Sequence, residues 1–136
     1  MKIFFLTSLI LIIAAPYCYA EISQYIDNEK QKCLDTNFQS DYTMAQCNYD
    51  AILKYNNEMQ KLMQKLKKIL TKAQYSALTA SQYQWELYIK NDNKLLANTL
   101  ESKFYFEPYL ISSEIKFQNY KQRYQELSDI YKYLKN

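Results

Sequence analysis

Residue types that commonly carry catalysis are scarce in this chain of 136 residues, which contains no histidine and no glycine. The missing histidine excludes a Ser-His-Asp or Cys-His nucleophile, and the missing glycine excludes a glycine-rich phosphate loop. Four carboxylates lie near one another in the sequence: Glu86, Asp92, Glu101 and Glu107. Glycoside hydrolases use such carboxylates in pairs. Carboxylates on helix surfaces are usually only solvated, so we predict a non-enzymatic protein that needs no cofactor.

The N-terminus has the pattern of a secretory signal. An apolar run, residues 3–15, follows a single lysine and is ended by a proline. Small residues at Cys18 and Ala20 stand where a signal peptidase reads the chain, so residues 1–20 are predicted to be a cleaved signal peptide. An uncleaved anchor is the alternative, but the run is short for a stable membrane span. Cleavage would leave residues 21–136 as a single periplasmic or secreted domain without a membrane span.

Two cysteines remain after the signal, Cys33 and Cys47. An even number of cysteines in an exported protein is typical of disulfides, so we predict that these two are bonded. Such a bond contributes about 3 kcal/mol to stability in the chain-entropy model. Zinc is the alternative, but without histidine a zinc site would need carboxylates, and we predict no metal.

Aromatic side chains are the best candidates for a binding site. Residues 101–113 read ESKFYFEPYLISS, and aromatic rings in a loop are costly to expose unless they contact a partner. The alternative is that the rings fold back over the protein's own core. The predicted contact residues are Phe104, Tyr105, Phe106, Glu107 and Tyr109.

The only tryptophan, Trp85, gives a second candidate, within the stretch LTASQYQWELY. Gln82 and Tyr88 lie about one turn before and after it, and the three residues together could form a groove for a partner. A large aromatic residue on an apolar stripe is usually buried, so the favoured interpretation is a core anchor. Gln82 would then form a hydrogen bond across the bundle to a backbone carbonyl or a tyrosine hydroxyl.

Helical periodicity places these candidates. Without glycine and with one proline after the signal, the chain favours helices joined by few loops over β-hairpins. Apolar residues recur at spacings of three and four in residues 44–70, 72–100 and 113–134, and a shorter pattern covers 21–34. We therefore predict an all-α fold, an antiparallel bundle of three long helices plus a short N-terminal helix tied by one disulfide.

The boundaries and inward faces of these helices can be predicted too. Asp41 or Thr43 is expected to cap the first long helix, and a capping box at Thr71 and Gln74 separates it from the second. One uninterrupted helix through this point is the alternative. The inward stripes are predicted as Ile52, Tyr55, Met59, Leu62, Leu66 and Ile69; Leu78, Ser81, Trp85, Tyr88, Asp92, Leu95 and Thr99, flanked by Ile89 and Leu96; Phe117, Tyr120, Tyr124, Leu127, Tyr131 and Leu134; and, in the short helix, Ile22, Tyr25, Ile26 and Lys30.

The charge of the chain is close to balanced. Seventeen basic and fourteen acidic residues become sixteen and fourteen once the signal is removed, a net charge of +2. This charge is too small to predict a nucleic-acid partner. The charges are interspersed along the sequence, which is typical of a solvated surface.

Several motifs resemble the lysozyme-inhibitor LprI-like N-terminal family, which consists of small exported bacterial helical domains. The similarity covers Cys33, the run TMAQC ending at Cys47, the stretch LTASQYQW with the following Tyr88, and the run RYQEL at 123–127. Ser81 replaces the usual alanine, and a second cysteine pair found in many members is missing.

This resemblance implies a binding role in the cell envelope. The leading hypothesis is that the protein occludes a lysozyme or a related muramidase. The alternative is an interaction module that binds another envelope protein, a toxin or peptidoglycan through the aromatic loop. Because lysozymes are basic proteins, a net charge of +2 gives no electrostatic attraction, and we expect weak or no inhibition.

Overall fold

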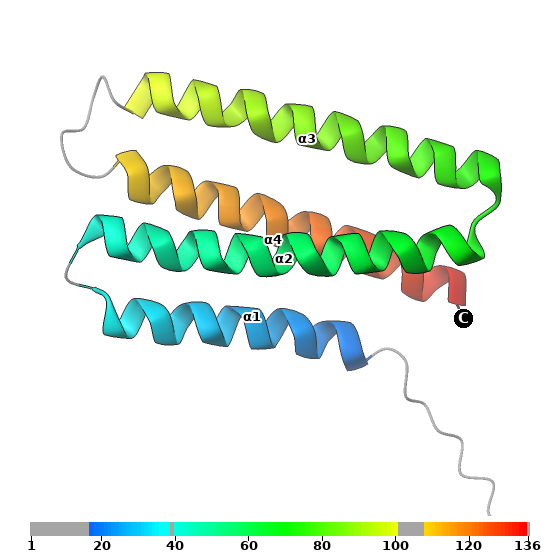
Figure 1. Ribbon diagram of the computed structural model, residues 1–136, viewed down its shortest axis with the longest axis horizontal. Helices are drawn as coiled ribbons and strands as arrows, with labels where there is room; N and C mark the ends of the chain where they lie inside the picture. Colours follow the sequence, from blue (N-terminus) through cyan, green and yellow to red (C-terminus); the bar gives the residue numbers. More distant parts are fainter. Residues whose placement is uncertain (1–16, 39, 101–107, 136) are drawn as a thin grey trace, which may run out of the picture.

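A computed structural model describes residues 17–38, 40–100 and 108–135, which form four helices (Figure 1). No strand occurs in these residues, and Cys33 is bonded to Cys47, so the predicted all-α class and the predicted disulfide are confirmed. The helices are α1 (Tyr17–Thr36), α2 (Asp41–Ile69), α3 (Lys72–Leu100) and α4 (Pro108–Lys135).

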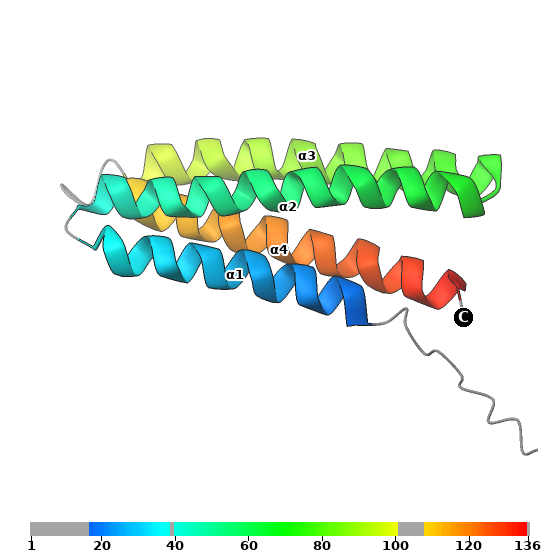
Figure 2. The same cartoon turned by 60° about the horizontal axis from the view of Figure 1, so that its bottom comes forward.

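Successive helices run in opposite directions, so α2 and α4 run the same way and lie side by side in the centre (Figures 1 and 2). α1 and α3 lie on opposite sides of this pair. α1, α2 and α4 supply every residue of the buried hydrophobic core cluster, and α3 packs against α4 through partly buried side chains. None of the helices in the described part combines the length and the apolar character that crossing a membrane requires.

α2 forms the centre of the core through the stripe predicted for it. Five of the six predicted residues are buried, whereas the sixth, Ile69, is exposed at the end of the helix. The helix begins at Asp41, three residues before the predicted start, because the Ser40 hydroxyl accepts a hydrogen bond from the Thr43 N–H and caps it. The expected caps, Asp41 and Thr43, were therefore wrong.

The boundary between α2 and α3 agrees with the predicted capping box. The Thr71 N–H donates to Gln74 Oε1 at 2.9 Å, and the Gln74 N–H donates to Thr71 Oγ1 at 3.3 Å. These reciprocal bonds satisfy two donors that the start of α3 leaves unpaired. The alternative of one uninterrupted helix is therefore wrong.

The predicted inward face of α3 was partly wrong. Ile89 is buried, and Trp85 and Leu78 are partly buried, but Ser81, Tyr88, Leu95 and Thr99 are exposed. The described contacts of α3 are mainly with α4, which covers only a narrow face. Helical periodicity alone predicts a broad apolar stripe. The predicted stripe was centred part of a turn away from the narrow face that contacts α4.

The last helix begins earlier than predicted. We expected a loop through residues 101–113, but α4 starts at Pro108. Of this stretch, residues 101–107 lie outside the described structure. A proline at the first helical position needs no hydrogen-bond donor and has a suitable backbone angle, so it starts a helix as readily as it ends one. Of the predicted stripe, Phe117, Tyr124 and Leu127 are buried, and Leu134 is exposed.

α1 is longer at both ends than the predicted segment 21–34. Ile26 is buried as predicted, whereas Tyr25 is exposed. Tyr19 is a core residue and meets Tyr131 edge to face, with ring centroids 5.6 Å apart. Cleavage after Ala20 would therefore remove a side chain that packs in the core of this structure.

A polar network joins α1 to the core. The buried Tyr55 hydroxyl lies 2.8 Å from Ser23 Oγ and donates to Asp27 Oδ1 at 2.9 Å. The other oxygen of Asp27 forms an ion pair with Lys121 of α4 at 2.5 Å. Burial raises the pKa of Tyr55 strongly, because its charged form would lose hydration, and the neighbouring Asp27 carboxylate raises it further.

We expect this raised pKa to make the fold sensitive to alkali. Above about pH 10 the unfolded chain releases the Tyr55 proton while the folded protein keeps it, so stability falls by up to about 1.4 kcal/mol per pH unit. Urea unfolding between neutral pH and pH 11 would measure this loss. The Tyr55→Phe variant should be less stable at neutral pH but should lose less on going to alkali. An equally steep alkaline loss in this variant would contradict the assignment.

Candidate binding surface

Trp85 lies in the interface between α3 and α4. Its ring meets Tyr120 edge to face at a centroid distance of 5.0 Å, and it packs against the edge of the core. Burial raises the pKa of Tyr120, and the nearby Glu86 carboxylate adds to this effect. The position agrees with the anchor role favoured from the sequence, although the indole is only partly buried.

Gln82 connects α3 to α4 through Arg123, whose residue surface is only 9 % exposed. Arg123 Nε donates to Gln82 Oε1 at 3.0 Å, and Nη2 donates to Ser81 Oγ at 3.1 Å. Nη1 forms an ion pair with Glu126 at 3.0 Å. Residues from two motifs of the resemblance, SQ at 81–82 and RYQEL at 123–127, therefore meet in space as a helix–helix contact.

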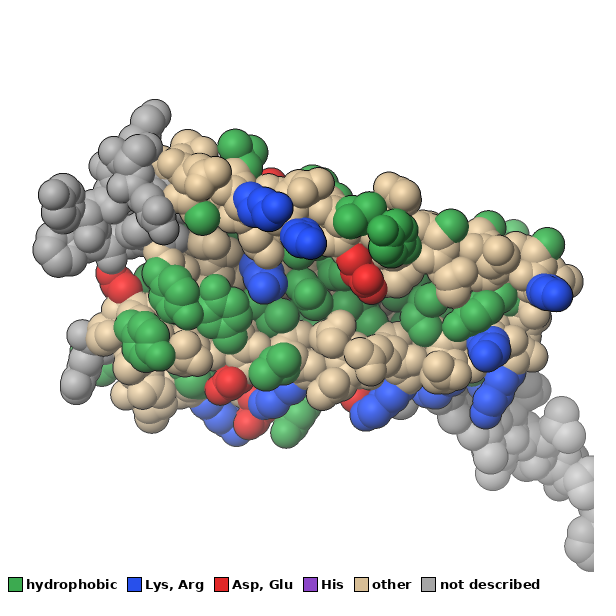
Figure 3. Space-filling model, turned by 45° about the horizontal axis from the view of Figure 1, so that its top comes forward, with side chains coloured by type: hydrophobic (Ala, Val, Ile, Leu, Met, Phe, Trp, Pro, Cys, Tyr) green, Lys and Arg blue, Asp and Glu red, His purple; other side chains and the backbone are tan. Residues whose placement is uncertain are grey.

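Tyr88 does not join Gln82 and Trp85. It is 54 % exposed on α3, whereas Gln82 and Trp85 face α4. Hydrophobic side chains do gather in a hollowed strip that runs along the molecule in Figure 3. In the described structure Gln82 and Trp85 hold α3 in place, and Tyr88 is a separate exposed ring.

Three tyrosines, two exposed and one partly buried, form a cluster where α2 and α4 begin, and we call this cluster the tyrosine patch. The rings of Tyr42 and Tyr109 are stacked, with an interplanar angle of 10° and centroids 5.9 Å apart. Tyr49 meets Tyr109 at 5.6 Å, and Lys116 Nζ lies 5.5 Å from the Tyr49 ring. Tyr42 is 63 % and Tyr109 is 44 % exposed. Partial burial and the neighbouring Tyr109 raise the pKa of Tyr49.

The tyrosine patch includes one residue of the predicted aromatic loop. Tyr109 lies in the first turn of α4. The other predicted contacts, Phe104, Tyr105, Phe106 and Glu107, lie outside the described residues. Tyr42 and Tyr49 were not predicted as contacts. The signal for them was present, because residues seven apart on a helix share a face.

Acidic residues outnumber basic ones near the tyrosine patch. Residues 29–50, which contain the end of α1 and the start of α2, carry four acidic residues and two lysines. Asp41 directly precedes Tyr42 in the sequence. Asp50 directly follows Tyr49 and is exposed. This segment beside the patch is therefore slightly negative, although the whole chain is positive.

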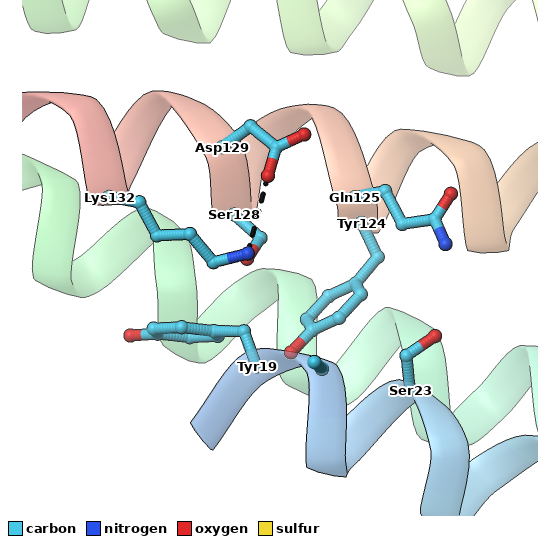
Figure 4. Close-up of a pocket in the computed structure, with 8 residues that line it drawn as sticks. Tyr19, Ser23, Tyr124, Gln125, Ser128, Asp129 and Lys132 are labelled. Atoms are coloured by element: carbon cyan, nitrogen blue, oxygen red, sulfur yellow. Dashed lines mark hydrogen bonds and ion pairs between the residues drawn. The ribbon is translucent and has the colours of Figure 1, made fainter. Parts of the chain in front are cut away.

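A pocket of about 230 Å³ lies elsewhere, between the start of α1 and the end of α4 (Figure 4). Its walls include Tyr19, Tyr124 and the ion pair of Lys132 with Asp129. Ser128 also lines it, and its buried hydroxyl has no hydrogen-bond partner among the described residues. A serine nucleophile needs a base bonded to its hydroxyl, so the pocket has no activated nucleophile in this structure. The described residues also include no group of three or more His, Cys, Asp or Glu side chains arranged to hold a metal ion.

Comparisons with family models, with curated proteins and with solved structures find no match to this chain. The resemblance to the LprI-like family therefore stays a prediction that depends on the motifs in the sequence. What the structure adds is geometric: an α3–α4 contact built from Gln82, Trp85 and Arg123, and an exposed tyrosine patch at the end of the bundle that carries the disulfide.

Proposed function

We propose that this protein is exported to the cell envelope and acts by binding a protein partner through the tyrosine patch. The observation that carries the proposal is the stacked pair of Tyr42 and Tyr109, two aromatic rings exposed beside each other on two rigid helices. Tyrosine supplies a large contact area with few rotatable bonds, so it is enriched in binding surfaces.

The pre-formed shape of the patch supports this role. Ring contacts with Tyr109, stacked for Tyr42 and tilted for Tyr49, restrict these side chains before any partner arrives. Binding therefore loses less side-chain entropy than it would with free rings. The disulfide between Cys33 and Cys47 joins the end of α1 to the start of α2, close in sequence to Tyr42. A rigid aromatic surface at the end of a bundle is suited to enter a cleft of a partner.

The charge around the patch favours a basic partner. The four acidic residues and two lysines of 29–50 give a slight local attraction that the net charge of the whole chain does not. Among basic partners, the sequence resemblance favours a lysozyme or a related muramidase, which the patch would occlude. Because long-range steering depends on the charge of the whole molecule, we expect weak inhibition at physiological salt.

Export is supported by the sequence and by the disulfide. Residues 1–20 have the signal pattern, and a structural disulfide persists in oxidising compartments such as the periplasm. We therefore place the protein in the periplasm or the secreted fraction. N-terminal sequencing of the exported protein would locate the cleavage point, which matters because Tyr19 packs in the core.

Replacing both Tyr42 and Tyr109 with alanine should weaken partner binding by about a hundredfold, since truncated aromatic hot spots typically cost about 1–2 kcal/mol each or more. The assay is capture of lysozyme or muramidase by the oxidised protein, together with a cell-wall lysis assay. Helicity should remain, because both rings are largely outside the core.

The matched control replaces two tyrosines outside the patch, Tyr83 and Tyr133, which are also exposed. This variant should bind as the unaltered protein does. Equal binding by both double variants would contradict the proposal that the patch binds the partner. Aromatic rings also stack on sugars, so retention on insoluble peptidoglycan that is lost in the Tyr42/Tyr109 variant would reassign the same patch to a glycan.

A further inference from the structure

The end of the bundle where α2 and α4 finish is rich in positive charge. Residues 59–72 and 127–135 contain seven lysines and one acidic residue, Asp129. α2 and α4 run in the same direction and finish at the same end, where α3 begins, so these lysines gather there (Figures 1 and 2). We call this the basic end. The mixed, solvated surface expected from the sequence is not found here.

Most of these lysines are available for an external anion. Lys61 is paired with Glu58 at 2.6 Å, and Lys132 is paired with Asp129 at 3.3 Å. On the face drawn in Figure 3, basic side chains lie at this end, and the acidic side chains lie nearer the middle and the other end. Four exposed lysines of the basic end form no ion pair with a described carboxylate: Lys67, Lys68, Lys72 and Lys135.

Exposed apolar residues occur at the same end. Ile69 is the last residue of α2, and Tyr133 and Leu134 lie in the last turn of α4. All three are exposed, and Tyr133 is exposed to 85 %. Lysines beside exposed aromatic and aliphatic side chains are typical of surfaces that rest in the interfacial region of a membrane. A soluble polyanion would use the lysines but not the apolar residues.

We propose that the basic end docks on an anionic phospholipid surface. The lysines attract the phosphate groups, and Ile69, Tyr133 and Leu134 enter the headgroup region without crossing the bilayer. The tyrosine patch lies toward the opposite end of α2 and α4, so it would point away from the membrane. The docking is independent of the partner proposed above, because it uses none of the patch residues.

Co-sedimentation with vesicles tests this docking on the oxidised, exported protein. We expect it to bind vesicles with about 30 mol % phosphatidylglycerol but not vesicles of pure phosphatidylcholine. About 0.5 M salt should release the bound protein. Each lysine near such a surface contributes about fivefold to partitioning, so replacing Lys67, Lys68 and Lys72 with glutamine should reduce binding about a hundredfold.

The matched control replaces three exposed lysines outside the basic end, Lys32, Lys90 and Lys94, with glutamine, which changes the net charge equally. This variant should keep most of its binding. Equal losses in the two triple variants, or equal binding to neutral vesicles, would overturn the proposal.

A second pair of measurements separates a membrane from a soluble polyanion. Replacing Tyr133 and Leu134 with serine should weaken vesicle binding and leave retention on a heparin column unchanged. If this variant binds vesicles as the unaltered protein does, the surface recognises polyanions in general, and the membrane assignment fails. The Tyr42/Tyr109 variant should bind vesicles normally, so failure of the patch proposal and failure of this one can be told apart.

Discussion

Replacing Cys33 and Cys47 with serine is expected to lower the free energy of unfolding by about 3 kcal/mol. The bond closes a short loop between α1 and α2, with a sequence separation of 14 and a Cα–Cα distance of 5.6 Å. Its loss returns conformational entropy to the unfolded chain. For a domain of this size the melting temperature should fall by roughly 10–15 °C, measurable by circular dichroism.

The loss should be concentrated in α1. This helix contributes fewer buried residues than α2, and two of its connections to α4 are partly solvated ion pairs, Lys30 with Glu114 and Asp27 with Lys121. Ion pairs of this kind contribute little, so the disulfide and the few buried residues of α1 must hold it. Hydrogen exchange in 17–36 should accelerate more than in α2 when the bond is absent. Unchanged melting, or equal acceleration in both helices, would contradict this role.

The fold could be predicted to the extent that burial follows sequence periodicity. α2 is covered on one long face by α1 and α4, and its predicted stripe is buried from Ile52 to Leu66. Its boundary with α3 was predicted because a capping box is a local signal, formed by Thr71 and Gln74 without help from the rest of the fold. The disulfide was predicted from cysteine number and compartment.

Features that depend on the neighbours of a helix could not be predicted. The inward face of α3 follows from its position outside the α2–α4 pair, and none of the described side chains of α3 belongs to the buried core cluster. The start of α4 was missed because Pro108 was interpreted as a breaker in an aromatic loop. The basic end was missed for a related reason, since its lysines come from two segments that only the shared direction of α2 and α4 brings together.

The candidate site shows the same division. Trp85 was favoured as an anchor from its apolar stripe, and it lies against Tyr120 in the interface. The expected hydrogen bond of Gln82 across the bundle is present, but its partner is Arg123, which the sequence did not identify. The tyrosine patch combines Tyr109 with two residues of α2 that are distant in sequence, so only the fold connects them.

Replacing Arg123 with methionine should detach α3 from the rest of the bundle. The guanidinium supplies two hydrogen bonds to α3, and hydrogen bonds of charged groups contribute about 1.5–3 kcal/mol each before non-additivity is considered. Methionine keeps much of the side-chain volume but donates no hydrogen bond. Since α3 has no residue in the core cluster, we expect a loss of about 2–3 kcal/mol that is confined largely to α3.

Trp85 reports this change directly, because it is the only tryptophan and lies in the α3–α4 interface. In the Arg123→Met variant its fluorescence should shift to longer wavelength and become easier to quench with acrylamide, while α2 keeps its slow hydrogen exchange. Gln122→Met is the matched control, since its side chain is exposed and donates a hydrogen bond within α4, to Glu126. Unchanged emission in the Arg123→Met variant would show that ring packing alone holds α3. This result would contradict the role assigned to Arg123.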